Sequence, residues 1–199
     1  MHMKILTLLS LTLVASAASA QDTDQVRKMF EAGRYQQVVE AAPPDAPAVV
    51  LFTAAQSQLK LGASEQAREI YRILAERPDG DAWHFIGVSG LQLLDDQADA
   101  AAESAERAIA IDDGLAEAHY QRGLALAKKQ DWRDAAAEFD RVSELSPSHA
   151  YAHYYGGLMH YRAGRPDRMA IHFEQFLKLA PDAPERPEVL QIMKTVRGR

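Results

Sequence analysis

The feature that most constrains this chain is an internal repeat with a period of 34 residues. Compared with itself at that offset, the sequence shows ten identical positions between 116–147 and 150–181. In the first copy they are Ala116, Ala118, His119, Tyr120, Gly123, Leu124, Ala136, Phe139, Leu145 and Pro147. A fixed period of roughly 20 to 50 residues is typical of stacked units, since one unit cannot bury its apolar face alone. The repeat therefore predicts a stack of similar units.

Each unit is predicted to be a pair of antiparallel helices. Apolar residues recur three and four positions apart in 116–130 and again in 133–145, which is the period of an amphipathic helix. Asp131 lies between the two segments, and Pro147 ends the second.

The period and pattern resemble the tetratricopeptide repeat, which has a large residue and then Leu-Gly in its first helix, Ala-x-x-x-Phe in its second, and a closing Pro. The residues that carry the resemblance are Gly123, Ala135 to Phe139 and Pro147 in one unit, and Gly157, Phe173 and Pro181 in the next. Upstream, Trp83 to Gly87 supplies a large residue and an Ile-Gly step. The resemblance implies an all-α fold, a right-handed α-solenoid of antiparallel helix pairs.

The expected solenoid spans residues 21–183, and a capping helix follows in 184–199 because the last unit would otherwise expose its core. The unit beginning at Gly80 is two residues longer than its neighbours, and we place the surplus in 94–97, between its helices. Gly87, Gly123 and Gly157 are expected to allow close contact with small residues of the second helices, such as Ala101. The expected units are 22–47, which is truncated, then 48–79, 80–115, 116–149 and 150–183.

The first twenty residues are predicted to be a signal peptide. Lys4 precedes an apolar run from Ile5 to Ala15, and the small residues of 17–20 follow. The run is shorter than the roughly 20 residues that a membrane-spanning helix needs. Cleavage after Ala20 implies a periplasmic or secreted protein, and no later segment is long enough to span a membrane.

The composition excludes several function classes. Twenty-two Lys and Arg against 28 Asp and Glu give a net charge of −6, so no basic surface is expected to attract nucleic acid. The chain contains no Cys, which rules out thiol catalysis, Cys-ligated zinc and a lipidated N-terminal Cys, and which suits an oxidising compartment. Hydrolase, nucleotide-binding and calcium-loop motifs are missing. We therefore predict no enzyme activity and no cofactor.

The resemblance implies that the first helices line a concave face, with side chains pointing into it once per unit. An apolar and aromatic stripe exposed in a groove is typical of an interaction site. We therefore predict a scaffold or adaptor of the cell envelope that binds an apolar or aromatic segment of a partner protein. The predicted groove residues are Phe52, Gln56, His84, Val88, Tyr120, Leu124, Tyr154, Leu158 and Tyr161.

Other interpretations of these residues stay open. The aromatic side chains could pack between adjacent units, since such a stripe at helical spacing is often core. A second copy of the chain could cover the stripe, giving a homo-oligomer. The protein could also be an accessory subunit of an enzyme or a histidine-based metal-binding protein.

His149, His153 and His160 lie along one side of one predicted helix, an arrangement compatible with a divalent metal. No Asp or Glu completes that face, and the HExxH motif is missing. Packing between helices is the favoured role of these rings, and no metal site is predicted.

Overall fold

The computed structural model describes residues 23–198, and the predicted signal peptide lies outside them. The described part is helical and contains no strand, which confirms the all-α prediction. A first helix occupies 23–31. The others are α2 (Tyr35–Glu40), α3 (Ala48–Lys60), α4 (Ser64–Ala75), α5 (Ala82–Leu94), α6 (Ala98–Ile111), α7 (Ala116–Lys128), α8 (Trp132–Leu145), α9 (Ala150–Arg162), α10 (Pro166–Leu179) and α11 (Arg186–Arg197).

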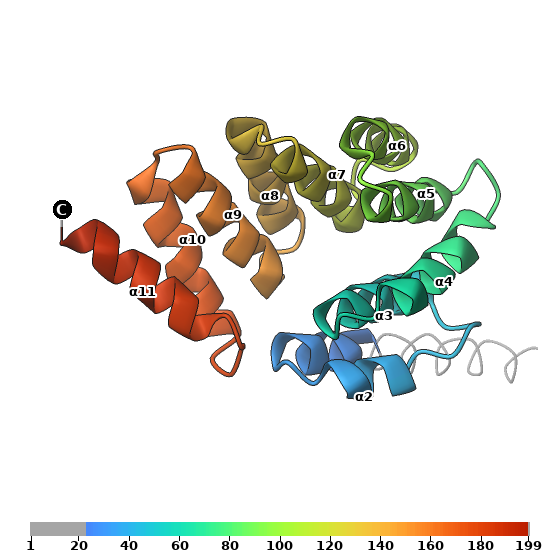
Figure 1. Ribbon diagram of the computed structural model, residues 1–199, viewed down its shortest axis with the longest axis horizontal. Coiled ribbons are helices and arrows are strands. Elements are labelled where there is room, and N and C mark those ends of the chain that lie inside the picture. Colours follow the sequence, from blue (N-terminus) through green and yellow to red (C-terminus); the bar gives the residue numbers. More distant parts are fainter. Residues whose placement is uncertain (1–22, 199) are drawn as a thin grey trace, which may run out of the picture.

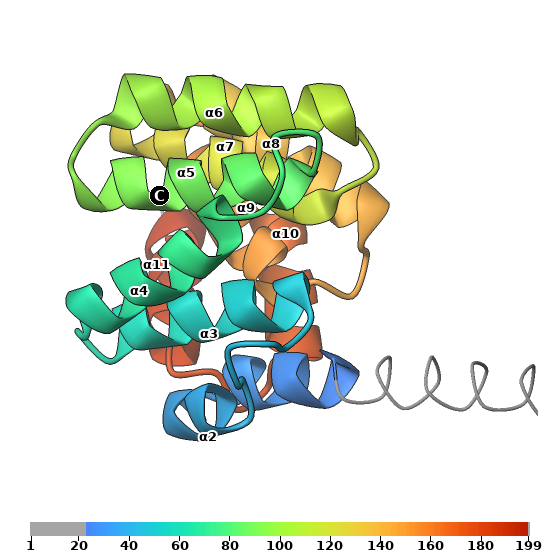
Figure 2. The ribbon, with the colours of Figure 1, turned by 90° about the vertical axis from the view of Figure 1, so that its right-hand side faces the viewer.

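The helices pack in chain order, each against the one before and the one after, so that antiparallel pairs follow one another along an arc (Figure 1). The inner side of the arc carries α3, α5, α7 and α9, and their partners lie outside, as α6 does over α5 in Figure 2. The arrangement is an α-solenoid, as predicted. At its end α11 packs on α10 and buries Val189 and Met193. No helix in 23–198 is both long and apolar enough to cross a membrane.

The turn after each inner helix requires a left-handed backbone. Gly62 and Gly164 have φ of 75° and 71°, while Asp96 and Gln130 adopt 63° and 66°. These four positions are spaced by 34 residues, as are the starts of α3, α5, α7 and α9 at residues 48, 82, 116 and 150. The period is therefore constant, and the two-residue surplus expected in 94–97 is wrong.

That register changes which residues of α5 are equivalent to those of other units. Ile86, which is fully buried, is the counterpart of Phe52 and Tyr120, so the expectation that His84 occupies this row is wrong. Val88 is displaced by the same two positions. The Trp83 to Gly87 segment has the residue types of the family pattern, a large residue and an Ile-Gly step. They occur two positions earlier than in the other units.

The glycines do bring helices together, but their neighbours differ from those predicted. A Cβ on Gly87 would lie 2.5 Å from the backbone nitrogen of Ala75 in the preceding unit. Gly123 and Gly157 instead face the rings of Phe139 and Phe173 in their own units. The contact with small residues expected for these glycines is therefore wrong, because two of them make room for a large aromatic ring.

Candidate functional site: the inner face of the arc

Three aromatic residues of the predicted stripe lie on the inner face but are buried. The exposed fractions of Phe52, Tyr120 and Tyr154 are 4%, 2% and 7%. Phe52 and Tyr120 meet edge to face with ring centroids 6.1 Å apart, and the ring of Tyr155 on α9 lies 5.8 Å from that of Tyr120. The prediction of a stripe exposed in an open groove is therefore wrong for these three residues.

The other predicted groove residues on the inner helices are half-buried, namely Gln56, His84, Val88, Leu124, Leu158 and Tyr161. The Gln56 amide donates a hydrogen bond of 2.7 Å to the Tyr71 hydroxyl. The His84 side chain, in the first turn of α5, turns towards the preceding loop, where its Nδ1 lies 3.0 Å from the Arg77 carbonyl oxygen. The inner face is thus a packed surface with a few accessible side chains rather than an exposed stripe.

The inner face is buried because the arc closes on itself. The first helix reaches the start of α9, where Arg27 Nη1 donates to the Ser148 carbonyl at 2.8 Å and to its hydroxyl at 2.9 Å. Glu31 accepts a hydrogen bond of 3.4 Å from the Ala150 amide, one of the unpaired donors at the N-terminus of α9. Figure 1 shows this first helix, in blue, below the lower end of α9.

A second set of contacts, which we call the closure cluster, consists of Tyr35, Lys60, Tyr151 and Glu185. The Lys60 ammonium lies 2.6 Å from one Glu185 oxygen, and the Tyr151 hydroxyl donates to the other at 2.6 Å. The Tyr35 and Tyr151 hydroxyls are 3.2 Å apart. Burial and the neighbouring carboxylate hold the pKa of Tyr151 far above its usual range, so this hydroxyl stays protonated and can donate.

A cavity of about 210 Å³ remains on the inner side, between the first helix and α3, α7 and α9. Its apolar wall includes Phe30, Phe52 and Tyr120, and its polar wall carries ionisable groups. These polar residues are Arg27, Glu31, Glu117 and His149. Burial raises the pKa of both Glu31 and Glu117. A small site with an apolar wall and two desolvated carboxyl groups is typical of specific recognition.

His149 does not join the other two histidines of the predicted trio. It lies just before α9, where its Nδ1 accepts a hydrogen bond of 3.1 Å from the Ala152 amide and caps the helix. Its ring is 5.2 Å from that of Tyr120. Burial and the Arg27 charge lower the pKa of His149 to about 4. At neutral pH the ring is therefore an uncharged hydrogen-bond acceptor.

We expect His149 to make stability depend on pH. Because its pKa is depressed in the folded chain, the unfolded chain takes up a proton first, and stability is lost as the pH falls from about 6.5 towards 4. The contribution lost between pH 6.5 and pH 5 is about 1.5 kcal/mol. Urea unfolding at the two pH values should show a smaller loss for His149→Asn, since Asn keeps a capping acceptor but does not titrate. An equal loss in both proteins would contradict this assignment.

His153 and His160 belong to a different group. Their rings lie on α9, facing His172 of α10 and Asp140 of α8. Nε2 of His160 and Nε2 of His172 are 2.9 and 2.8 Å from the same Asp140 oxygen. The expectation that no acidic residue completes the histidine face is therefore wrong, because the carboxylate comes from a neighbouring helix.

The fold and the enclosed aromatic face define the class of protein, which is a helical-repeat solenoid. Two segments, 49–79 and 120–184, match models of the tetratricopeptide repeat. The chain is therefore a tetratricopeptide-repeat protein, as predicted. This fold supports a protein–protein interaction scaffold, and proteins built from this repeat are typically not catalytic.

Solved structures of similar fold include other proteins of this kind. TTC0263, a thermophilic TPR protein of Thermus thermophilus, is 18% identical, with a TM-score of 0.63 over 88% of this chain and 99% of that one. YrrB, described as a TPR protein with an unusual peptide-binding site, is 16% identical, with a TM-score of 0.51 over 94% and 88%. MamA is 21% identical, with a TM-score of 0.51 over 73% and 84%. Curated proteins gave no match.

Proposed function

We propose that this protein is a non-enzymatic scaffold of the cell envelope, and that it binds a partner protein by taking an apolar or aromatic side chain into the cavity beside Phe52 and Tyr120. The observation that carries the proposal is the cavity itself. An apolar cavity of roughly 150 Å³ holds a benzene ring, and this one measures about 210 Å³. It therefore has room for one aromatic side chain but not for a helix, about 10 Å in diameter.

The polar wall supports recognition of a main-chain segment next to that side chain. Arg27 can donate to a carbonyl group, and Glu31 and Glu117 can accept from amides. Because the fold already desolvates the Glu31 and Glu117 carboxyl groups, part of the cost of binding is met before the partner arrives. The peptide-binding site noted for YrrB, a protein of similar fold, agrees with a peptide ligand. The N-terminal pattern of Lys4, an apolar run and small residues supports export to the envelope.

The proposal predicts that filling the cavity abolishes partner binding. Thr53 lines it from α3, and its hydroxyl is bonded only to the Val49 carbonyl of the same helix in the described structure, at 2.7 Å. We expect Thr53→Trp to place an indole where the partner's side chain would enter, and to reduce partner recovery at least about tenfold. A photoreactive residue at position 53 should form a discrete adduct in intact cells, and mass spectrometry of that adduct identifies the partner.

Thr195 on α11 provides a matched control, because its hydroxyl makes the same bond to a carbonyl four residues earlier, at 2.9 Å. Thr195→Trp should leave binding intact, and a photoreactive group there should give no such adduct. Circular dichroism must show equal helicity in both variants. If the partner identified through position 53 still binds Thr53→Trp normally, the cavity is not the binding site.

A further inference from the structure

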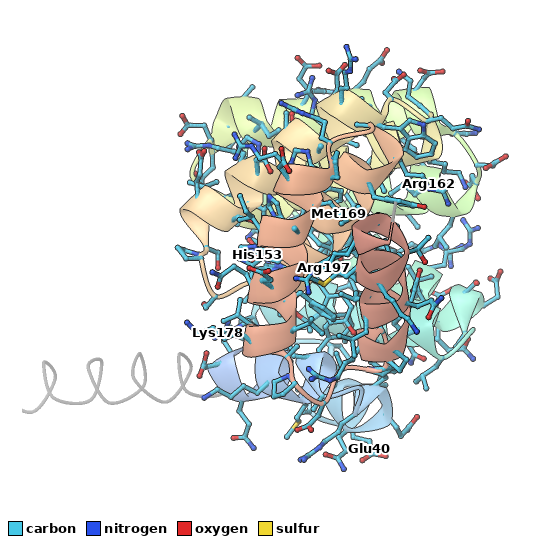
Figure 3. The ribbon with its side chains drawn as sticks, turned by 90° about the vertical axis from the view of Figure 1, so that its left-hand side faces the viewer. Glu40, His153, Arg162, Met169, Lys178 and Arg197 are labelled. Atoms are coloured by element: carbon cyan, nitrogen blue, oxygen red, sulfur yellow. The ribbon has the colours of Figure 1, made fainter. Side chains whose placement is uncertain are left out.

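A cluster of three histidines and a carboxylate lies between α8, α9 and α10. This part of the arc is opposite α3, which lines the cavity. The members of the cluster are Asp140, His153, His160 and His172. Figure 3 looks onto this part of the arc and shows His153 beside α10. His160 is fully buried, the His172 side chain is 7% exposed, and that of Asp140 is 28% exposed. The carboxylate is thus the member through which solvent reaches the cluster.

The protons of this cluster can be assigned from its contacts. Nε2 of His153 lies 3.2 Å from the Pro147 carbonyl oxygen, which can only accept, so this nitrogen carries the proton. Nδ1 of a neutral His153 is then an acceptor, and the only donor 3.3 Å away in the described structure is Nδ1 of His172. A neutral His172 that donates from Nδ1 carries no proton on Nε2. This unprotonated Nε2 lies 2.8 Å from an oxygen of the Asp140 carboxylate.

Two lone pairs at that distance repel, unless a positive charge lies between them or next to them. The charge is either a second proton on His172 or a metal ion. Separately, Nδ1 of His160 is buried and has no hydrogen-bond partner among the described residues. A buried polar atom without a partner costs free energy, so packing alone does not explain a fully buried His at this position.

The preceding unit shows that packing does not require these histidines. Thirty-four residues earlier, Leu126 takes the place of His160 and Glu138 takes the place of His172. There His119, the counterpart of His153, pairs with the Glu138 carboxylate at 2.8 Å and with a backbone carbonyl at 3.2 Å. Of these two units, only the later one has histidines at the positions of Leu126 and Glu138, and these two histidines contact the same carboxylate.

We propose that Asp140, His160 and His172 bind a divalent transition-metal ion of the zinc class. The ligands are the carboxylate and the two Nε2 atoms, all of which lie within 4.8 Å of one another. Ligands about 2.0 Å from a tetrahedral ion are about 3.3 Å apart, so a small rotation of the half-buried Asp140 side chain makes the room. A set of two imidazoles and one carboxylate, without thiolate, suits zinc, cobalt or nickel rather than magnesium or calcium.

The remaining contacts complete this assignment. His153 accepts the Nδ1 proton of His172 and so fixes the orientation of that ligand, as outer groups do around metal-binding histidines. Three protein ligands leave one coordination position open towards solvent on the Asp140 side. The site is separate from the cavity of the proposed function, and neither proposal depends on the other.

Calorimetric titration of the tag-free chain, from residue 21 onward, with zinc chloride tests the proposal. We expect one ion per chain, and visible absorption when cobalt(II) is used instead. Asp140→Asn and His160→Leu should each weaken zinc binding at least about 100-fold. His160→Leu introduces the residue type that the preceding unit carries at this position, so it is expected to fold. Thermal melting without metal checks the fold of both variants.

His119→Gln is the matched control, because His119 occupies in the preceding unit the position of His153. It should bind zinc like the original chain, as should His149→Asn. The proposal is overturned if the unmodified chain takes up no zinc at millimolar concentration. It is also overturned if folded His160→Leu and Asp140→Asn variants retain full affinity, or if either control removes the binding.

Discussion

Replacing Tyr151 by Ala is expected to destabilise the protein by about 3 to 5 kcal/mol and to open the arc. The Tyr151 ring is 1% exposed and lies 4.8 Å from Phe30 of the first helix and 5.9 Å from Phe176 of α10. Its removal leaves a cavity and takes from Glu185 the hydroxyl that this carboxylate accepts. Urea unfolding measures the loss of stability, and small-angle X-ray scattering should show a larger radius of gyration.

Phe173→Ala separates the two effects. Phe173 is fully buried and packs against Gly157 of its own unit, and its side chain takes no part in the polar contacts of the closure cluster. We expect a similar loss of stability without expansion of the folded chain. An unchanged radius in Tyr151→Ala would show that the arc stays closed without this residue, and expansion in both variants would show that any core defect loosens the stack.

Gly87→Ala is expected to cost about 3 kcal/mol, although alanine is the better helix former by about 1 kcal/mol. The added Cβ would lie 2.5 Å from the Ala75 nitrogen and 2.7 Å from the Tyr71 carbonyl oxygen. Both atoms belong to the α4 backbone, which can yield only if α4 and α5 move apart. The midpoint of urea unfolding should therefore fall sharply.

Gly80→Ala is the control, since nothing lies within 4 Å of its new methyl group. Its φ is not left-handed, and a small gain of about 0.4 to 1 kcal/mol is expected from the less flexible unfolded chain. Equal stability of the two variants would mean that α4 and α5 are not in such close contact.

The sequence was sufficient to predict the stack of helix pairs, because the 34-residue period and the helical spacing of apolar residues are local signals. It was not sufficient to set the register of α5. Gly87 follows a large residue and an Ile, as the family pattern requires, and this match shifted His84 and Val88 by two positions. The left-handed turn residues were the better marker, since Asp96 and Gln130 occur at the position of Gly62.

The burial of Phe52, Tyr120 and Tyr154 could not be predicted from the repeat, since an inner-face residue has the same spacing in an open groove and in a closed arc. The contacts that close the arc come from residues outside the regular pattern. Arg27 belongs to the truncated first unit, and Glu185 lies between the last pair and the cap. Neither has a counterpart in other units that would indicate its role.

The sequence of α9 alone indicated only part of the histidine group, namely His153 and His160. His149 precedes the helix and points elsewhere, whereas Asp140 and His172 come from the two adjacent helices. Comparing units position by position would have singled out the group, because Leu126 and Glu138 both correspond to histidines. Shared positions reveal the fold of a repeat protein, and departures from them reveal its chemistry.

Closure also affects how the chain folds. Contacts between neighbouring units join residues about 34 positions apart in the sequence, whereas the contact of Arg27 with Ser148 joins residues 121 positions apart. Each doubling of a loop costs about 0.6 kcal/mol, so this long contact costs only about 1 kcal/mol more than a contact between neighbours. In an open array each repeat can unravel from an end on its own. Here both ends hold each other, so we expect the whole arc to melt in one cooperative step, with the joining of its ends as the last event of folding.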